Sequence, residues 1–258
     1  MPKRLLDAAG LLLIRDGSGN SGGLEILLGR RRRQARAFPG EYVFPGGLVE
    51  AADLRPSGFH ESVAAPSAGF DGATRRNLLV FARTALRECY EETGLLLVGG
   101  GPPAAPAPRA CRDPVWSAFA EAARAPAFPA LLPVARAITP RGYPRRFHSR
   151  FFMTVLGGSA QVVPADPLRL LAGDGELEDL AWVPIAETRR LPLAGANAVV
   201  LDEVQDRLLR RHRPGDPWPG SLAGAPAPCF TWRGPREDQY RTVIPAAGHQ
   251  GGDRGGDA

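Results

Sequence analysis

Residues 84–95 read Thr-Ala-Leu-Arg-Glu-Cys-Tyr-Glu-Glu-Thr-Gly-Leu, and this stretch predicts both a helix and its chemistry. Glu88, Glu91 and Glu92 are spaced at i, i+3 and i+4, so on a helix they lie within an arc of roughly 100°. Carboxylates at this spacing repel one another unless a positive charge lies between them. A divalent cation would supply that charge, and oxygen ligands suit Mg²⁺ or Mn²⁺. We therefore expect the three glutamates to be metal ligands.

The predicted helix begins near Asp71 or Thr74, either of which can cap it, and it ends at Gly94, which readily adopts a left-handed conformation. Arg87 lies one turn before Glu91 and can orient that carboxylate by pairing with it. An apolar stripe beside the acidic face is typical of an amphipathic surface helix. Its members are Leu78, Leu79, Ala82, Ala85, Leu86 and Cys89.

Upstream of this helix, the segment Phe44-Pro45-Gly46-Gly47 predicts a turn. A Glu-Glu pair alone is usually a solvated helix surface, but its agreement with this turn and with the Gly94 stop makes chance a poor explanation. Residues 87–95 resemble the second half of the Nudix box, and residues 44–47 resemble its opening. This box is the signature of the Nudix hydrolases. The resemblance covers roughly residues 8–209.

The resemblance implies an α/β fold, an α/β/α sandwich around a mixed sheet. It also implies that Mg²⁺ or Mn²⁺, held by Glu88, Glu91 and Glu92, assists hydrolysis of a nucleoside diphosphate derivative. Two features depart from the box: the usual Glu six residues after Gly47 is Asp53, and the spacer before the helix is longer than usual. Residues 54–73 are the expected insertion, and their Pro, Gly and Ser content predicts a surface loop.

Basic residues gather at 30–33, with Arg36 following. Guanidinium groups bind phosphates in a bidentate way, although a charge run alone favours a solvated surface. The spacing of these arginines, of Gly40 and of the box resembles the signature of coenzyme A diphosphatases. That resemblance implies substrate contacts by Arg31 and Arg36, and by Gly46 and Gly47 of the box.

Two further segments carry candidate site residues. The basic stretch 144–150 resembles the matching segment of coenzyme A diphosphatases with an inserted box, and it makes Arg146 a candidate phosphate ligand or else a surface arginine. Glu176 precedes a Trp-containing strand predicted at 180–183. Nudix proteins often place an acid there, which implies a catalytic base or an extra metal ligand, with a solvated carboxylate as the alternative.

Composition narrows the class of protein. The 258 residues are 44% hydrophobic and carry a net charge of +5. This length can bury one sizeable core, and the basic balance suits an anionic ligand or weak nonspecific nucleic-acid binding. Three cysteines without metal-type spacing favour a reducing, cytoplasmic location. No apolar stretch approaches the roughly 20 residues of a membrane span.

Periodicity and turn residues predict one domain over residues 1–212 and a Gly/Pro-rich tail over 213–258, with disorder at its end. Phe230, Trp232 and Tyr240 could tether part of that tail. Strands and helices along the chain agree with an α/β/α sandwich. We expect strands at 8–15, 24–30, 42–44, 150–156 and 180–183, and further helices at 115–124 and 196–211.

Coenzyme A or acyl-coenzyme A is the first substrate that the resemblance suggests. ADP-ribose or another nucleoside diphosphate derivative stays open, as does a non-catalytic, Nudix-like ligand sensor. One carboxylate, either Glu91 or another box glutamate or else Glu176, would accept the proton of the attacking water, and Arg87 would orient the catalytic group. We expect a small-molecule substrate, no specific nucleic acid and no membrane partner. A homodimer is compatible with this expectation.

Overall fold

The computed structural model describes the chain in several stretches. They are residues 4–17, 23–35, 37–54, 66, 70, 74–99, 114–157, 160–164, 176–206, 227–233 and 240–244. Arg36, which the sequence suggests as a substrate ligand, lies outside them, as do residues 207–211 of the predicted last helix.

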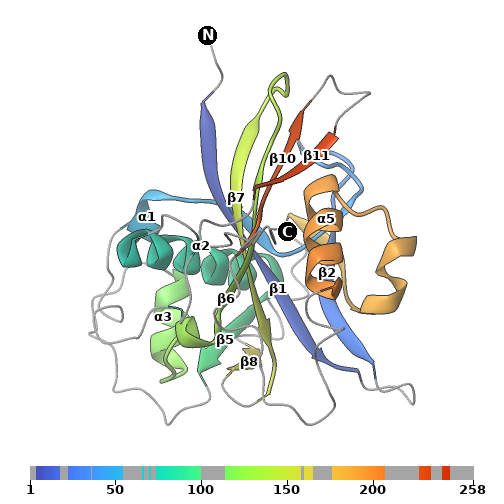
Figure 1. The fold of residues 1–258 in the computed structure, drawn as a ribbon. Helices are drawn as coiled ribbons and strands as arrows, with labels where there is room; N and C mark the ends of the chain where they lie inside the picture. The colour runs from blue at the N-terminus through green and yellow to red at the C-terminus, as the bar shows by residue number, and fades with distance from the viewer. Residues whose placement is uncertain are drawn as a thin grey trace, which may run out of the picture.

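A mixed sheet forms the centre of the molecule, with helices on both faces (Figure 1). Its strands are β1 (Leu5–Asp16), β2 (Leu24–Arg31), β3 (Tyr42–Val43), β4 (Gly46–Leu48), β6 (Leu132–Ile138), β7 (Arg146–Val155), β9 (Leu177–Pro184), β10 (Cys229–Arg233) and β11 (Tyr240–Ile244). The order is β11-β10-β6-β7-β1-β2-β3, with β4 paired to β1 and β9 paired to β2. β1 and β2 form the predicted antiparallel hairpin, whereas β1 and β7 run parallel.

Helices cover the two faces of this sheet. They are α1 (Ala51–Leu54), α2 (Arg75–Thr93), α3 (Pro114–Glu121) and α5 (Gly195–Val204), with short 3₁₀ helices η1 (Phe128–Ala130) and η2 (Ile185–Arg190). Two smaller strands, β5 (Leu95–Gly99) and β8 (Ala160–Pro164), pair beside α2 and α3. The predicted α/β/α sandwich is confirmed. None of the described helices is long and apolar enough to cross a membrane.

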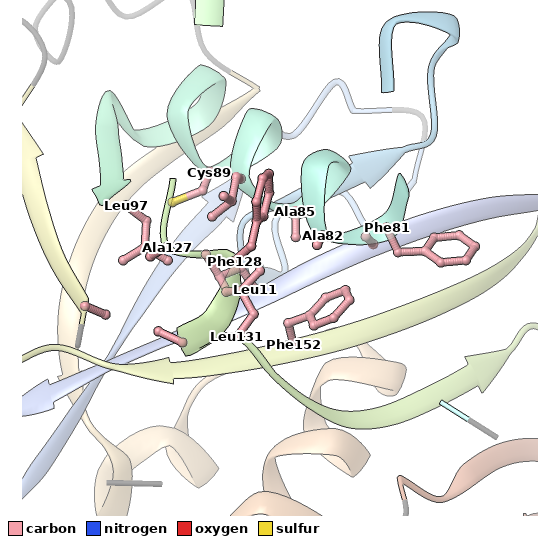
Figure 2. Close-up of a cluster of buried hydrophobic side chains, with 14 of the residues drawn as sticks. Leu11, Phe81, Ala82, Ala85, Cys89, Leu97, Ala127, Phe128, Leu131 and Phe152 are labelled. Carbon is pink, nitrogen blue, oxygen red and sulfur yellow. The ribbon is translucent and has the colours of Figure 1, made fainter. Parts of the chain in front are cut away.

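Two apolar clusters hold the layers together because β1 is buried on both faces. Leu11 belongs to the cluster under α2, whereas Leu12 belongs to the cluster under α5. A strand covered on both sides reads as a continuous apolar run rather than an alternating one. Figure 2 shows the cluster under α2, where Ala82, Ala85 and Cys89 face Leu11, Phe128, Leu131 and Phe152.

The ends of α2 are where the sequence predicts them. The side chain of Thr74 accepts a hydrogen bond from the amide of Asn77, as an N-cap does, and Asp71 lies outside the described residues. Gly94 is left-handed, with φ 69°, and its amide donates to the carbonyl of Tyr90. The predicted helix at 115–124 is shorter and stops at Glu121, since Ala123 has φ 50°.

Two segments whose composition suggests exposed loops contribute buried residues to the core. In the insertion, Pro66 and Phe70 are buried, and the Phe70 ring packs edge-on against Phe152 with centroids 5.2 Å apart. This part of the predicted surface loop is therefore anchored in the core. In the Gly/Pro-rich tail, β10 pairs in parallel with β6, and Phe230 is fully buried. The expected tether at Phe230 is thus a strand of the main sheet.

Candidate active site

The glycines of the Phe-Pro-Gly-Gly segment allow the backbone to lie close against α2, the helix that carries the three glutamates. Gly46 and Gly47 lie on β4, a strand rather than the predicted turn, and pair with Gly10 and Ala9 of β1. A Cβ at Gly47 would lie closer than 3.0 Å to the Glu88 carboxylate, so a side chain here would displace that group. The amide of Gly46 donates to Glu92 at 2.8 Å. Glycine is therefore required for the close approach.

Asp53, the residue at the position of the usual box glutamate, is fully buried and binds Arg87. Its two carboxylate oxygens accept hydrogen bonds from Arg87 Nε at 3.1 Å and Arg87 Nη2 at 3.0 Å. Thr84 Oγ1 and the amide of Glu50 each donate to it at 2.9 Å. With these four donors, Asp53 is a positioning residue for the arginine.

Arg87 connects Asp53 to two of the predicted metal ligands. Its Nη1 lies 2.7 Å from Glu91 and 3.0 Å from Glu88. The Glu91 contact is the pairing predicted from sequence. Burial disfavours the Arg87 charge, but the hydrogen bond to Asp53 and the charges of Glu88, Asp53 and Glu91 together raise its pKa above the ordinary value. Arg87 is therefore a fixed cation that orients the carboxylates around it.

Two of the glutamates are held in an environment that disfavours their charge. Burial raises the pKa of Glu88 to about 7, although Arg87 opposes the shift. Burial also raises the pKa of Glu92 to about 8, against the hydrogen bond from Gly46, and the charge of Glu88 adds to the increase. By contrast, the side chain of Glu91 is 46% exposed. A cation beside these groups would relieve both the desolvation and the mutual repulsion.

Arg31 and Glu176, predicted from different parts of the sequence, meet at this site. Arg31 Nη2 lies 2.7 Å from Glu176 Oε2. Both charges act on Glu92, since Arg31 lowers its pKa and Glu176 raises it. The pairing of β2 with β9, in which Arg31 is the register partner of Leu177, brings the two residues together. The side chain of Glu176 is 70% exposed and so accessible to a ligand.

Arg146 lies elsewhere. Its Nε donates to the carbonyls of Thr139 and Pro140 at 3.2 and 3.1 Å and so supports the turn before β7. Its register partner on β1 is Leu5, whereas the box glycines pair with Ala9 and Gly10. Four to five residues of strand separate the two places, about 13–16 Å. The structure does not bring Arg146 to the glutamates, and its role in substrate binding stays a prediction.

The remaining basic residues are partly neutralised. Arg30 pairs with Glu178 and Asp179 at 3.2 and 2.5 Å, so it is less available to phosphate than the charge run implies. Arg150, in the second basic stretch, pairs with Asp7 and lies 3.9 Å from the centre of the Phe81 ring. Of the 30–33 run, Arg31 is the member that the structure connects to the box.

The donor set fits a hard divalent cation, although the carboxylates do not converge. Within the stretches described above, no three His, Cys, Asp or Glu side chains lie close enough together to hold a metal ion. Glu88 and Glu91 turn toward Arg87, whereas Glu92 turns toward the amide of Gly46. All three ligands offer oxygen, and two of them are buried with raised pKa values. In its chemistry, such a set of oxygen donors suits Mg²⁺ or Mn²⁺.

The residues that hold Asp53 in place beside Arg87 were not predicted from the sequence. Thr84 donates to Asp53, and Arg83, which is 6% exposed, donates to the Asp53 carbonyl at 3.1 Å. The signal available in the sequence was a polar pair, Arg83-Thr84, on the helix face that also carries Arg87 one turn later. Buried polar groups at such positions need partners, and Asp53 is that partner.

Comparison with known proteins gives two informative likenesses. No family model matches the chain. Acyl-coenzyme A diphosphatase NUDT19 of Gallus gallus is 34% identical over 99 residues, which make up 30% of this chain and 26% of that protein. The match thus spans about a quarter of the length of this relative.

The second likeness is structural and covers most of the fold. The crystal structure of a Nudix hydrolase from Alicyclobacillus acidocaldarius matches with a TM-score of 0.56 and 28% sequence identity, over 77% of this chain and 90% of that one. The fold, the box residues gathered around Arg87 and these two likenesses together place the chain in the Nudix hydrolase superfamily.

Proposed function

We propose that this chain hydrolyses the diphosphate bond of a nucleoside diphosphate derivative with the help of Mg²⁺ or Mn²⁺, and that coenzyme A or acyl-coenzyme A is its substrate. The arrangement around Arg87 carries the proposal: Glu88 and Glu91 contact its guanidinium, and Glu92 lies against the amide of Gly46. Burial of the Glu88 and Glu92 carboxylates disfavours their charged forms and so lowers stability, which supports a catalytic role for them.

The choice of coenzyme A is supported by the likeness to an acyl-coenzyme A diphosphatase. It is also supported by the position of Arg31, which belongs to the segment resembling the coenzyme A signature and contacts Glu176 beside the box. We further propose that the domain comprises residues 1–212 together with strands β10 and β11 of the Gly/Pro-rich tail, which belong to the main sheet. We propose that it acts in the cytoplasm on a small molecule, without a nucleic-acid or membrane partner. A homodimer is compatible with this proposal.

The residues of the chain have distinct tasks in the proposed reaction. Glu88, Glu91 and Glu92 would hold the cation, which when bound offsets charge on the phosphate oxygens and lowers the pKa of a nearby water. Arg31 and the backbone of Gly46 and Gly47 face the diphosphate. Arg87, fixed by Asp53, keeps Glu91 in place.

Hydrolysis adds one water across the diphosphate. The water oxygen forms a bond to one phosphorus, the bridging P–O bond breaks, and a carboxylate accepts the water proton. Glu91 and Glu176 are the exposed carboxylates at the site, with side chains 46% and 70% accessible. We expect one of these two to be the base. Glu176→Gln tests the choice without changing a proposed metal ligand: a large fall in kcat with little change in KM assigns the base to Glu176, and an unchanged kcat assigns it to Glu91.

A substrate screen tests the proposal. Purified protein is incubated with coenzyme A, an acyl-coenzyme A, ADP-ribose and other nucleoside diphosphate derivatives, each with Mg²⁺ or Mn²⁺, and nucleotide release is measured. We expect the highest kcat/KM for the coenzyme A compounds and none after chelation. A higher kcat/KM for ADP-ribose than for the coenzyme A compounds would make ADP-ribose the substrate instead. No hydrolysis of any compound, together with tight binding of one, would indicate a ligand sensor.

A further inference from the structure

The loop between β2 and β3 holds an aromatic residue in a backbone conformation that such residues rarely adopt. Phe38 has φ 53°, in the left-handed region that is uncommon for residues other than Gly, Asn and Asp. Pro39 follows it, and the residue before a proline is normally extended. Strain of this kind persists where the surrounding structure enforces it, and it is frequent at ligand-binding sites.

Phe38 is only partly buried despite this strain. Phe38 is 38% exposed, whereas Phe128, Phe152 and Phe230 are fully buried. Among the described residues, the other exposed large hydrophobics are Leu5 and Leu54, and neither has a positive φ. The loop therefore combines a strained backbone with an aromatic residue that stays accessible to a ligand.

Hydrogen bonds attach this loop to the backbone of Arg31, whose side chain belongs to the candidate active site. The amide of Gly40 donates to the carbonyl of Arg31 at 3.0 Å, and the amide of Arg31 donates to the carbonyl of Glu41 at 2.9 Å. The amide of Glu41 in turn donates to the carbonyl of Phe38 at 3.2 Å. Since two residues of chain span at most about 7 Å, Phe38 lies close to the backbone of Arg31. The guanidinium of Arg31 is the group that contacts Glu176.

We propose that Phe38 is a specificity-determining residue that stacks on the base of a nucleotide ligand. The choice of ligand rests on the proposed function. A nucleobase offers a flat π-face, and stacking on an aromatic side chain is favourable for every base. The exposed Arg32 and Arg33 in the same loop suit a ligand that also carries phosphate. Arg31 then faces the phosphates while Phe38 covers the base.

Two ligands that differ only in the base provide the test. AMP and ribose 5-phosphate are titrated calorimetrically into the full-length protein without added metal. For wild type we expect AMP to bind more tightly than ribose 5-phosphate. Phe38→Ala should remove about tenfold of this preference, and Phe38→Trp should retain it. Leu5→Ala is the matched control, since Leu5 is 37% exposed near the start of β1 and should change neither affinity.

A second pair of variants tests the strain. Phe38→Gly and Phe38→Ala both remove the ring, but glycine accepts the positive φ whereas alanine keeps the strain. We expect Phe38→Gly to unfold at a temperature roughly 2–4 °C higher than Phe38→Ala, with equally weak AMP binding. Such a result would show that the positive φ at this position strains the backbone, whereas equal melting temperatures would refute the strain.

Three outcomes overturn the inference: no preference for AMP in wild type, an unchanged preference in Phe38→Ala, or equal loss of both ligands in that variant. Failure of the proposed function would be recognised by a different set of outcomes from these three. A wild-type protein that hydrolyses no diphosphate but prefers AMP through Phe38 leaves this inference intact. Conversely, active enzyme whose Phe38→Ala variant keeps its KM for nucleotide substrates and its AMP affinity refutes the inference alone.

Discussion

Replacing Asp53 by Asn should both destabilise the protein and disturb the metal site. The carboxylate is fully buried and accepts two hydrogen bonds from Arg87, one from Thr84 and one from the amide of Glu50. Breaking a buried ion pair costs about 3–5 kcal/mol. We expect the lower end, about 3 kcal/mol, because Arg87 keeps its contacts to the box glutamates. For a chain of this length the melting temperature should fall by roughly 6–12 °C.

The same substitution should weaken Mn²⁺ binding by about 10–100-fold, the usual cost of losing a residue that orients a ligand. Thermal unfolding and Mn²⁺ titration followed by electron paramagnetic resonance measure the two effects. Asp202→Asn is the matched control, because its pair with Arg189 is exposed on both sides and contributes at most about 1 kcal/mol. Thr84→Ala, which removes a hydrogen bond to this buried carboxylate, should cost about 1.5–3 kcal/mol. If Asp53→Asn matched wild type in both assays, the positioning role of Asp53 would be refuted.

The remaining predictions concern the box glycine, the basic run and acid stability. Gly47→Ala should leave the circular dichroism spectrum unchanged but lower turnover by at least about 100-fold, because the new Cβ displaces the flexible Glu88 side chain. Arg31→Ala should raise KM by about tenfold or more in steady-state kinetics, whereas Arg30→Ala, whose partners lie on β9, should not. Burial, together with neighbouring arginines, lowers the pKa of His148 from 6.5 to about 4. As the pH falls, the histidine therefore takes up its proton in the unfolded chain before it does so in the folded protein. The contribution of neutral His148 to the free energy of unfolding is thus complete above about pH 6.5 and is lost between pH 6.5 and 4. In His148→Gln, the change in the free energy of unfolding across that pH window, measured by urea denaturation, should be smaller than in wild type by about 1–2 kcal/mol after allowance for solvent screening. Identical pH profiles for the two proteins would contradict the lowered pKa of His148.

The acidic helix was predictable because its signals are local. Thr74 caps it, Gly94 ends it, and the apolar stripe between them has helical spacing, so each feature can be read within twenty residues. β6 was not predictable in this way. Its Pro133 cannot donate to a ladder and lies at a register shift against β7, and Arg136 interrupts its apolar run. β10 was missed because its partner in the sheet lies about ninety residues earlier in the chain.

The same limit applies to the site. The three glutamates come from one helix, so their spacing alone placed them together. The contacts of Asp53 and Glu176 depend on residues far away in sequence: 31 residues separate Asp53 from Thr84, and 145 separate Arg31 from Glu176. Residue type suggested each as a candidate, but the tertiary fold decides that Asp53 binds Arg87 and that Arg31 meets Glu176. Local pattern cannot supply that information, since nonlocal pairing is set by the whole sheet.

The most direct test of the account is metal binding by the box carboxylates. Glu92→Gln keeps an oxygen that can accept the hydrogen bond from Gly46 but removes the charge, so the fold should persist. Titration of Mn²⁺ followed by electron paramagnetic resonance should show saturable binding to wild type and at least about tenfold weaker binding to this variant. Equal binding by the two proteins, or none by wild type, would contradict the claim that these glutamates form a catalytic metal site.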